Sequence, residues 1–167
     1  NSSKKELLLF RDRLGVKPLF YTLTDNTLVF ASEIKGLFAY PTVTPILDKD
    51  GLCEIFALGP AKSYGRGVFK DIFEVLPGQC ITFGKYSCEK CFYWKLESHP
   101  HEDSMDETIE KTAWLITDSV KKQMLSDIPI STFLSGGVDS SLVTSICAKE
   151  LKKHGKRLNT FSFDFQD

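Results

Sequence analysis

The sequence of 167 residues has no long hydrophobic run and no large net charge. A helix needs about 20 consecutive apolar residues to cross a bilayer, and the longest apolar runs here, such as Leu7–Phe10, are far shorter. The net charge of −1 gives neither the basic excess typical of nucleic-acid binding nor the acidic excess typical of disorder. No targeting or lipidation signal is present. We therefore expect a cytoplasmic protein with no nucleic-acid or membrane partner.

The sequence also lacks the cysteine pattern of a disulfide framework. Its five cysteines are an odd number without a secretory signal, which favours reduced thiols. Cys88 and Cys91 have zinc-knuckle spacing, but no second close pair follows, and only His99 and His101 lie nearby. We interpret Cys88 and Cys91 as turn residues, and a zinc-binding module remains an alternative.

Residues 1–96 are predicted to be rich in strands. Asp25-Asn26 is a hairpin signal, Ser32 is expected to cap a helix through Ala39, and Asp48 to cap a second helix that ends at Gly59. The predicted strands are 7–10, 18–23, 27–31, 68–75, 79–83 and 91–96.

The polar segment 97–103 contains a central proline and is predicted to be a linker. Ser104 and Glu107 then form a capping-box pattern that opens a long helix. The helix carries one apolar stripe, interpreted as a face that packs on a core: Ile109, Ala113, Ile116, Val120 and Met124. The expected organisation is one domain over 1–96, the linker 97–103 and a second domain over 104–167.

A strand, a glycine loop, a helix and a second strand are predicted after Pro129. Their expected ranges are 130–134, 135–139, 140–154 and 158–165. Such a unit packs right-handed within a parallel sheet. The chain begins at Asn1, in a polar turn, and stops just after the last strand, so we expect a piece of a longer protein.

The glycine loop has the features of an anion site. Unpaired N–H groups at the start of a helix attract negative charge, and Gly136 and Gly137 let phosphate oxygens approach the backbone. Hydroxyl donors come from Ser135, Ser140 and Ser141. Asp139 would repel a phosphate unless a cation such as Mg²⁺ bridged them. The alternative is a plain Ser/Gly turn whose aspartate caps the helix.

The stretch Ser-Gly-Gly-Val-Asp-Ser-Ser at 135–141 resembles the signature of the ATP pyrophosphatase superfamily, whose members cleave ATP between the α and β phosphates. The flanking segments 133–134 and 160–163 resemble those of asparagine synthetases. This resemblance implies ATP and Mg²⁺ as cofactors, with the metal at Asp139. It also implies that Leu134 and Phe163 lie against the adenine nucleotide.

Residues 11–21 resemble the Arg-Asp-x-x-Gly-x-x-Pro-Leu segment of class II glutamine amidotransferase domains, and further landmarks follow at 31–37, 76–79 and 93–94. The implied fold is α/β and α+β: part of a strand-rich, Ntn-type amidotransferase domain, followed by the start of a Rossmann-like parallel-sheet ATP-pyrophosphatase domain. The resemblance implies that Asp12 binds the α-ammonium of glutamine. The alternative for Asp12 is an ion pair with Arg11 or Arg13.

The implied activity of the parent enzyme is a ligase reaction. Aspartate, ATP and ammonia from glutamine would give asparagine through β-aspartyl-AMP, with AMP and pyrophosphate released, and a homodimer is the candidate assembly. The family's nucleophile is an N-terminal cysteine that this chain does not show, so no catalytic residue is assigned and the chain alone is expected to be inactive. The alternatives are a β-lactam-synthetase-like enzyme, a sugar or peptide amidotransferase, and a non-catalytic interaction module.

Overall fold

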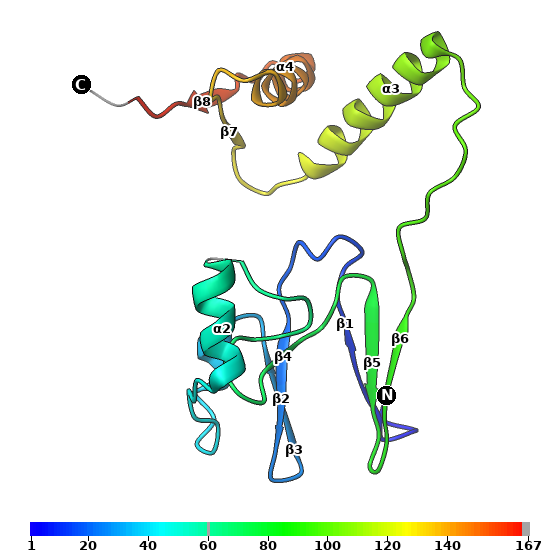
Figure 1. Ribbon diagram of the computed structural model, residues 1–167. Coiled ribbons are helices and arrows are strands. Elements are labelled where there is room, and N and C mark those ends of the chain that lie inside the picture. Colours follow the sequence, from blue (N-terminus) through cyan, green and yellow to red (C-terminus); the bar gives the residue numbers. More distant parts are fainter. Residues whose placement is uncertain (60, 165–167) are drawn as a thin grey trace. The chain divides into compact units, whose positions relative to one another are not determined.

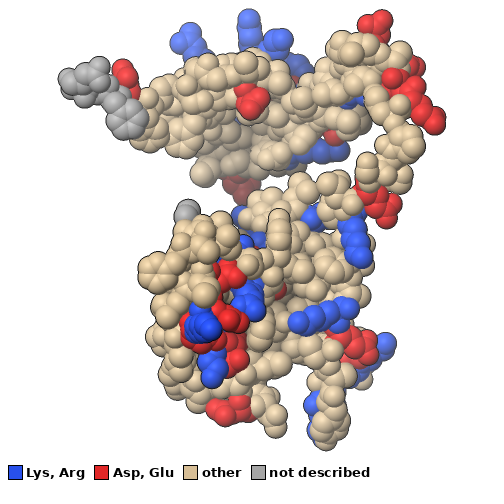
Figure 2. Space-filling view, in the orientation of Figure 1, with Lys and Arg blue, Asp and Glu red and all other residues tan. Residues whose placement is uncertain are grey.

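The computed structural model describes residues 1–59 and 61–164, and it divides the chain into two compact units, Asn1–Ser98 and His99–Asp167 (Figure 1). The strand predicted at 158–165 extends past the described residues, and within them the strand covers only Asn159–Phe161. Within the described part of the chain, no helix is both long and apolar enough to cross a membrane. Acidic and basic side chains are intermingled on the face of the first unit that Figure 2 shows, in agreement with a net charge near zero.

Two antiparallel sheets form the first unit (Figure 1). The first has the strand order β1-β5-β6, with β1 at Leu7–Phe10, β5 at Gln79–Phe83 and β6 at Cys88–Phe92. The second has the order β3-β2-β4, with β3 at Thr27–Ala31, β2 at Phe20–Thr24 and β4 at Phe73–Glu74.

Strand β2 contributes to two hydrophobic clusters, because side chains on both of its faces are buried. Tyr21 belongs to one core cluster, which joins the two sheets and also contains Leu9, Val75, Ile81 and Phe83. Phe20, on the opposite face of β2, belongs to a second cluster with Leu37, Val43 and Ile72. Alternating side chains of one strand thus connect two hydrophobic layers.

The two helices of this unit are α1 at Ile34–Leu37 and α2 at Lys49–Leu58. Helix α2 begins and ends as predicted, because the Asp48 side chain accepts a hydrogen bond from the Gly51 N–H and Gly59 follows the last turn with a φ of 59°. The prediction for α1 was wrong in its cap and its length. Glu33, not Ser32, is the N-cap, and the helix is a single turn stabilised by the fully buried Leu37.

The hairpin at Asp25-Asn26 is confirmed, since both residues have positive φ angles as a type I′ turn requires. The strand predicted over 68–75 is limited to β4, because Val68 and Asp71 adopt φ angles of 69° and 58° that no strand accommodates. The strand predicted at 91–96 covers Cys88–Phe92 instead. It begins at Cys88 because a tight turn closed by the Gly84 N–H and the Ser87 carbonyl sets its register.

The second unit contains two helices and a short pair of parallel strands. These are α3 at Met105–Gln123, β7 at Ser131–Phe133, α4 at Val138–Lys153 and β8 at Asn159–Phe161. The predicted capping box is present, with reciprocal bonds between Ser104 and Glu107. Helix α4 begins at Val138, before the predicted start, because Gly137 already provides the N-cap.

Few apolar side chains are buried in the second unit. Among its described residues only Cys147 is buried, and α3 buries none. The apolar stripe on α3 packs in part: Ile116, Val120 and Met124 are half-buried, whereas Ile109 is exposed. The structure thus establishes mixed α and β architecture, with small antiparallel sheets in the first unit and one β-α-β unit in the second.

Candidate functional site

The loop that follows β1 wraps around the carboxylate of Asp12. Its Oδ1 accepts hydrogen bonds from the backbone N–H groups of Leu14 (3.2 Å) and Val16 (2.9 Å), and its Oδ2 accepts one from Lys17 (2.9 Å). Gly15, in this loop, has a φ of 68°, and a Cβ there would lie 2.7 Å from the Pro77 ring. A glycine is therefore required for the loop to close around the carboxylate.

Backbone hydrogen bonds keep Asp12 ionised. The N–H groups of Lys17 and Val16, in that order of importance, hold the pKa of the Asp12 carboxyl below its usual range. Each carboxylate oxygen accepts about two hydrogen bonds, so Oδ2, with one partner, keeps a free acceptor direction. The side chain is exposed. An exposed, supported carboxylate of this kind can bind an ammonium group from solution.

The alternative ion pair between Asp12 and a neighbouring arginine does not form among the described residues. Arg11 instead points into the protein, where Nη1 lies 2.7 Å from Glu74 Oε1. Nη1 also donates to the Val75 carbonyl (2.8 Å), Nη2 to the Gly15 carbonyl (3.0 Å) and Nε to the Lys17 carbonyl (3.0 Å). The guanidinium thus holds the carbonyl groups of the loop whose N–H groups surround Asp12.

The glycine loop of the second unit begins at the carboxyl end of β7 and ends in the first turn of α4. Gly136 has a φ of 83°, which favours glycine, and a Cβ at this position would meet no atom within 4 Å. A Cβ at Gly137 would have only the Ser135 hydroxyl nearby, at 3.7 Å. The space beside both glycines is therefore open, and the first N–H groups of α4 have no helical partners.

The serine hydroxyls hold this loop in shape. Ser135 Oγ lies 3.0 Å from Ser140 Oγ, and the Ser135 N–H donates to Ser140 Oγ (3.3 Å). The hydroxyls of Ser140 and Ser141 both donate to the Gly137 carbonyl, at 3.1 and 2.8 Å. In this arrangement the backbone N–H groups, rather than the hydroxyls, are the donors that an anion would meet first.

Asp139 lies exposed in the first turn of α4. The other predicted residues of this site lie at the same end of the β7–β8 pair. The Leu134 N–H donates to the Phe161 carbonyl (2.8 Å), and Ser162 Oγ donates to the Leu134 carbonyl (2.7 Å). Phe163 stacks on Phe133 with ring centroids 5.9 Å apart. Because the strands are parallel, their carboxyl ends share one edge, and the structure brings Leu134, Phe163 and the glycine loop to that edge.

Cys88 and Cys91 lie on strand β6 and not in a turn, so that interpretation was wrong. Three positions apart on a strand, their side chains leave opposite faces and cannot bind one ion. No group of three or more His, Cys, Asp and Glu residues that could hold a metal occurs within residues 1–59 and 61–164. All five cysteines are free thiols, and Cys80 and Cys147 are the buried ones.

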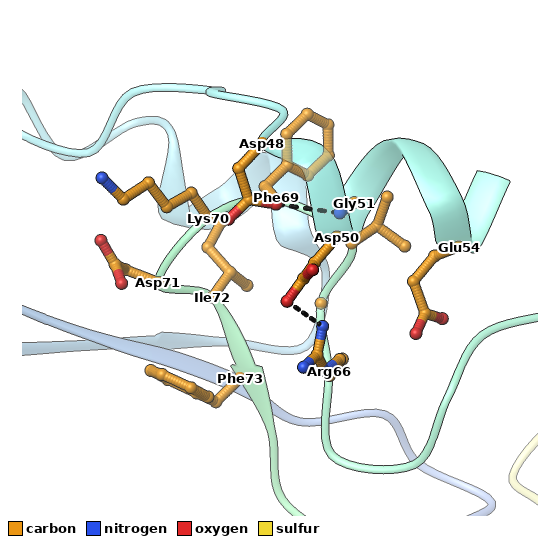
Figure 3. Close-up of a pocket in the computed structure, with 12 residues that line it drawn as sticks. Asp48, Asp50, Gly51, Glu54, Arg66, Phe69, Lys70, Asp71, Ile72 and Phe73 are labelled. Atoms are coloured by element: carbon orange, nitrogen blue, oxygen red, sulfur yellow. Dashed lines mark hydrogen bonds and ion pairs between the residues drawn. The ribbon is translucent and has the colours of Figure 1, made fainter.

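The first unit also contains a hollow between the start of α2 and the segment 66–73 (Figure 3). There Asp48 caps Gly51, and Arg66 pairs with Asp50 at 3.1 Å. Asp48, Asp50 and Arg66 thus stabilise the start of α2, and none of the predicted site residues lines the hollow.

Sequence reasoning missed the buried pair of Arg11 and Glu74. One signal was available, since Glu74 stands between Phe73 and Val75 in an apolar stretch, where a charge is costly unless it is paired. Tyr93 was noted only as a landmark, yet its hydroxyl donates to the Arg11 carbonyl at 2.6 Å. That bond joins residues distant in sequence, and no local pattern indicates it.

Comparison with known protein families matches these two regions separately. The family model of the glutamine amidotransferase domain matches residues 1–94. This match covers more than half of the chain. The chain belongs to the glutamine amidotransferase domain family. A second family model, asparagine synthase, matches residues 111–167, which include the glycine loop and helix α4.

Curated relatives match nearly the whole chain. A protein of Bacillus subtilis named asparagine synthetase [glutamine-hydrolyzing] 3 is 46% identical over 98% of this chain, and asparagine synthetase [glutamine-hydrolyzing] 2 of the same organism is 33% identical over 92%. Amidase chyE of Penicillium rubens is 30% identical over 97%. The chain spans 27%, 22% and 24% of the lengths of these relatives, respectively.

Proposed function

We propose that this chain is part of a glutamine-dependent asparagine synthetase, an ATP-dependent carbon–nitrogen ligase. The observation that carries the proposal is the presence, on one chain, of a supported carboxylate in an amidotransferase-family unit and an open anion loop in a region that matches the asparagine synthase model. The proposed domains are 1–96 and 104–167, joined by the linker 97–103.

In the amidotransferase domain, Asp12 binds the α-ammonium of glutamine. The lowered pKa of its carboxyl supports this role, since the group stays negative throughout the neutral range in which glutamine carries its ammonium. A charge-assisted hydrogen bond to the free direction of Oδ2 would fix the end of the substrate remote from the amide that is cleaved. The hydrolysis itself requires a nucleophile, and we assign that role to no residue of this chain.

In the second domain, residues 134–141 and 163 form part of an ATP site within a Rossmann-like sheet. The β and γ phosphates lie over the open space beside Gly136 and Gly137, where the N–H groups of α4 offset the charge that develops on the leaving pyrophosphate. Ser135, Ser140 and Ser141 become additional donors when their hydroxyls rotate toward the phosphates. The apolar side chains of Leu134 and Phe163 pack against the adenine nucleotide.

The oxygen ligands available at this loop suit Mg²⁺. An exposed carboxylate at Asp139, with phosphate oxygens nearby, is the hard oxygen environment that this ion prefers, and Mg²⁺ commonly binds through one or two carboxylates plus phosphates and water. Bound there, the ion would neutralise phosphate charge. The β-carboxylate of aspartate then attacks the α-phosphorus of ATP to give β-aspartyl-AMP, and ammonia from glutamine displaces AMP.

A second candidate is amide transfer to a different acceptor. It is favoured by the 30% identity to a fungal protein named as an amidase, over nearly all of the chain. Both candidates use the two loops in the same way and differ in the carboxylate that is activated.

The test uses a full-length polypeptide that contains residues 1–167, supplied with aspartate, Mg-ATP and glutamine labelled at its amide nitrogen. The proposal predicts labelled asparagine, AMP and pyrophosphate in equal amounts. Formation of AMP and pyrophosphate only with another acceptor would replace it by the second candidate. ADP and phosphate as products would contradict both.

A further inference from the structure

Arg11 is the most extensively bonded buried charge in the first unit, yet the proposed chemistry does not use it. Its side chain is 9% exposed, and that of its partner Glu74 is 7% exposed. Burying two charges is costly unless they are paired and fully hydrogen-bonded. Glu74 receives a second partner from Lys62, whose side chain also lies over the Phe20 ring.

The direction of the Arg11 bonds shows what the pair supports. Two of them reach the Gly15 and Lys17 carbonyls of the loop, at 3.0 Å each. The same loop directs its N–H groups toward Asp12. One side of the loop is therefore held by a guanidinium and the other by a carboxylate, so the position of Asp12 depends on both.

The backbone of Arg11 is fixed as well. Its N–H donates to the Gln79 carbonyl (3.1 Å), and its carbonyl accepts from the Tyr93 hydroxyl (2.6 Å). The Asp12 carbonyl accepts from the Gly78 N–H (3.0 Å). The residue that anchors the loop is thus itself anchored to β5 and to the segment after β6.

We infer that Arg11 and Glu74 are positioning residues for glutamine: the buried pair holds loop 12–17 so that the Asp12 carboxylate meets the substrate's ammonium. This inference rests on the proposed function of Asp12. Lys62 completes the charge balance of Glu74 but makes no bond to the loop, which makes it a matched control.

The experiment measures the KM for glutamine and the ammonia-dependent rate in a full-length protein that contains this chain. Arg11→Met removes the donors to the loop. We expect the KM for glutamine to rise roughly tenfold or more, because small misplacements of a binding group have large effects. The kcat at saturating glutamine and the ammonia-dependent rate should change little. Lys62→Met should leave the KM for glutamine unchanged.

An unchanged KM in Arg11→Met would overturn the inference, and so would an equal rise in Arg11→Met and Lys62→Met, which would indicate a general structural effect. If Arg11→Met fails to fold, Arg11→Lys replaces it. Lysine keeps the charge opposite Glu74 but lacks the planar fork that reaches both loop carbonyls, so its KM should also rise. An unchanged KM in Arg11→Lys would overturn the inference as well.

Asp12→Asn separates this inference from the function on which it rests. A raised KM for glutamine in Asp12→Asn, with no change in the Arg11 variants, would overturn the positioning role alone. No change in Asp12→Asn would overturn the binding role of Asp12 and the inference together.

Discussion

The two loops of this chain, 12–17 and 135–141, differ in how they use their backbone N–H groups. Loop 12–17 directs its own N–H groups inward to a carboxylate, and the buried Arg11 holds it from behind. The loop 135–141 leaves the N–H groups at the start of α4 without helical partners, beside glycines with open space around them, and its serine hydroxyls are bonded within the loop. The first offers a negative charge, and we propose that the second receives one.

The two units also differ in how many side chains they bury. The first unit contains both core clusters, whereas the described residues of the second bury only Cys147. The supported carboxylate therefore lies in the well-packed unit, and the open anion loop in the one with little buried apolar surface. Local stability depends on such burial, so we expect the two units to unfold separately.

The largest predicted effect concerns this difference in packing. Ile81→Ala removes a fully buried side chain from the first unit and should cost about 2–5 kcal/mol of its unfolding free energy. Leu142→Ala, in α4, is the matched control. Its side chain belongs to a residue that is 42% exposed, so the cost should be about 1 kcal/mol or less.

The two tryptophans allow each unit to be followed alone, because Trp94 lies in the first unit and Trp114 in the second. Denaturant titrations of Trp94→Phe and Trp114→Phe backgrounds should give two midpoints, with Ile81→Ala moving only the one reported by Trp94. A single shared midpoint would contradict the separation of the units.

The next effect concerns the carboxylate. Asp12→Asn removes the charge that we propose binds glutamine, and hydrogen bonds to charged groups contribute about 1.5–3 kcal/mol. In a full-length protein the KM for glutamine should rise roughly tenfold to a hundredfold, with ammonia-dependent synthesis retained. Steady-state rates with each nitrogen donor measure this. Equal losses with both donors would indicate that Asp12 only maintains the fold.

A smaller effect is expected at the glycine loop. In Gly136→Ala the new Cβ meets no atom, but the alanine must adopt a φ of 83°. This strain should destabilise the second unit by about 1–2 kcal/mol. Gly137→Ala keeps an ordinary φ of −77° and loses only the preference of glycine at an N-cap, a cost of about 0.5 kcal/mol. Trp114 fluorescence during denaturation compares them, and a larger cost at Gly137 would refute the assignment of strain to Gly136.

The smallest effect is a difference in thiol reactivity. Burial raises the pKa of the Cys80 and Cys147 thiols, which lowers their thiolate fraction. A disulfide reagent should modify the exposed Cys53, Cys88 and Cys91 in the native protein and reach the other two only after unfolding. Equal rates of modification at all five thiols would show that neither unit protects its buried cysteine.

The sequence allowed most local features to be predicted, because they depend on neighbouring residues. The type I′ turn at Asp25-Asn26, the cap at Asp48 and the capping box at Ser104 are of this kind. The left-handed conformation of Val68 was not predicted, since it depends on the close approach of the Val68 carbonyl to Gly51. A Cβ at Gly51 would lie 2.1 Å from that carbonyl oxygen. Tertiary contact overrode a strong β propensity there.

The candidate sites show the same difference between features set by neighbouring residues and features set by tertiary contacts. The glycine loop could be recognised from consecutive residues, and so could Asp12. The support of Asp12 could not, because Arg11 meets Glu74 only when β1 and β4 come together in the folded unit. Sequence patterns thus indicated the groups that we propose contact substrates, and the structure was needed to find the residues that hold Asp12 in place.

The most direct test of the account uses Asp139→Ala and Asp12→Asn in one full-length protein, with both half-reactions measured. Asp139→Ala should lower aspartate-dependent pyrophosphate release by about a hundredfold or more while glutamine hydrolysis continues. Asp12→Asn should raise the KM for glutamine hydrolysis while pyrophosphate release with ammonia continues. Near-normal pyrophosphate release in Asp139→Ala would contradict the assignment of the glycine loop to ATP, and with it the central claim that the two loops serve two separate half-reactions.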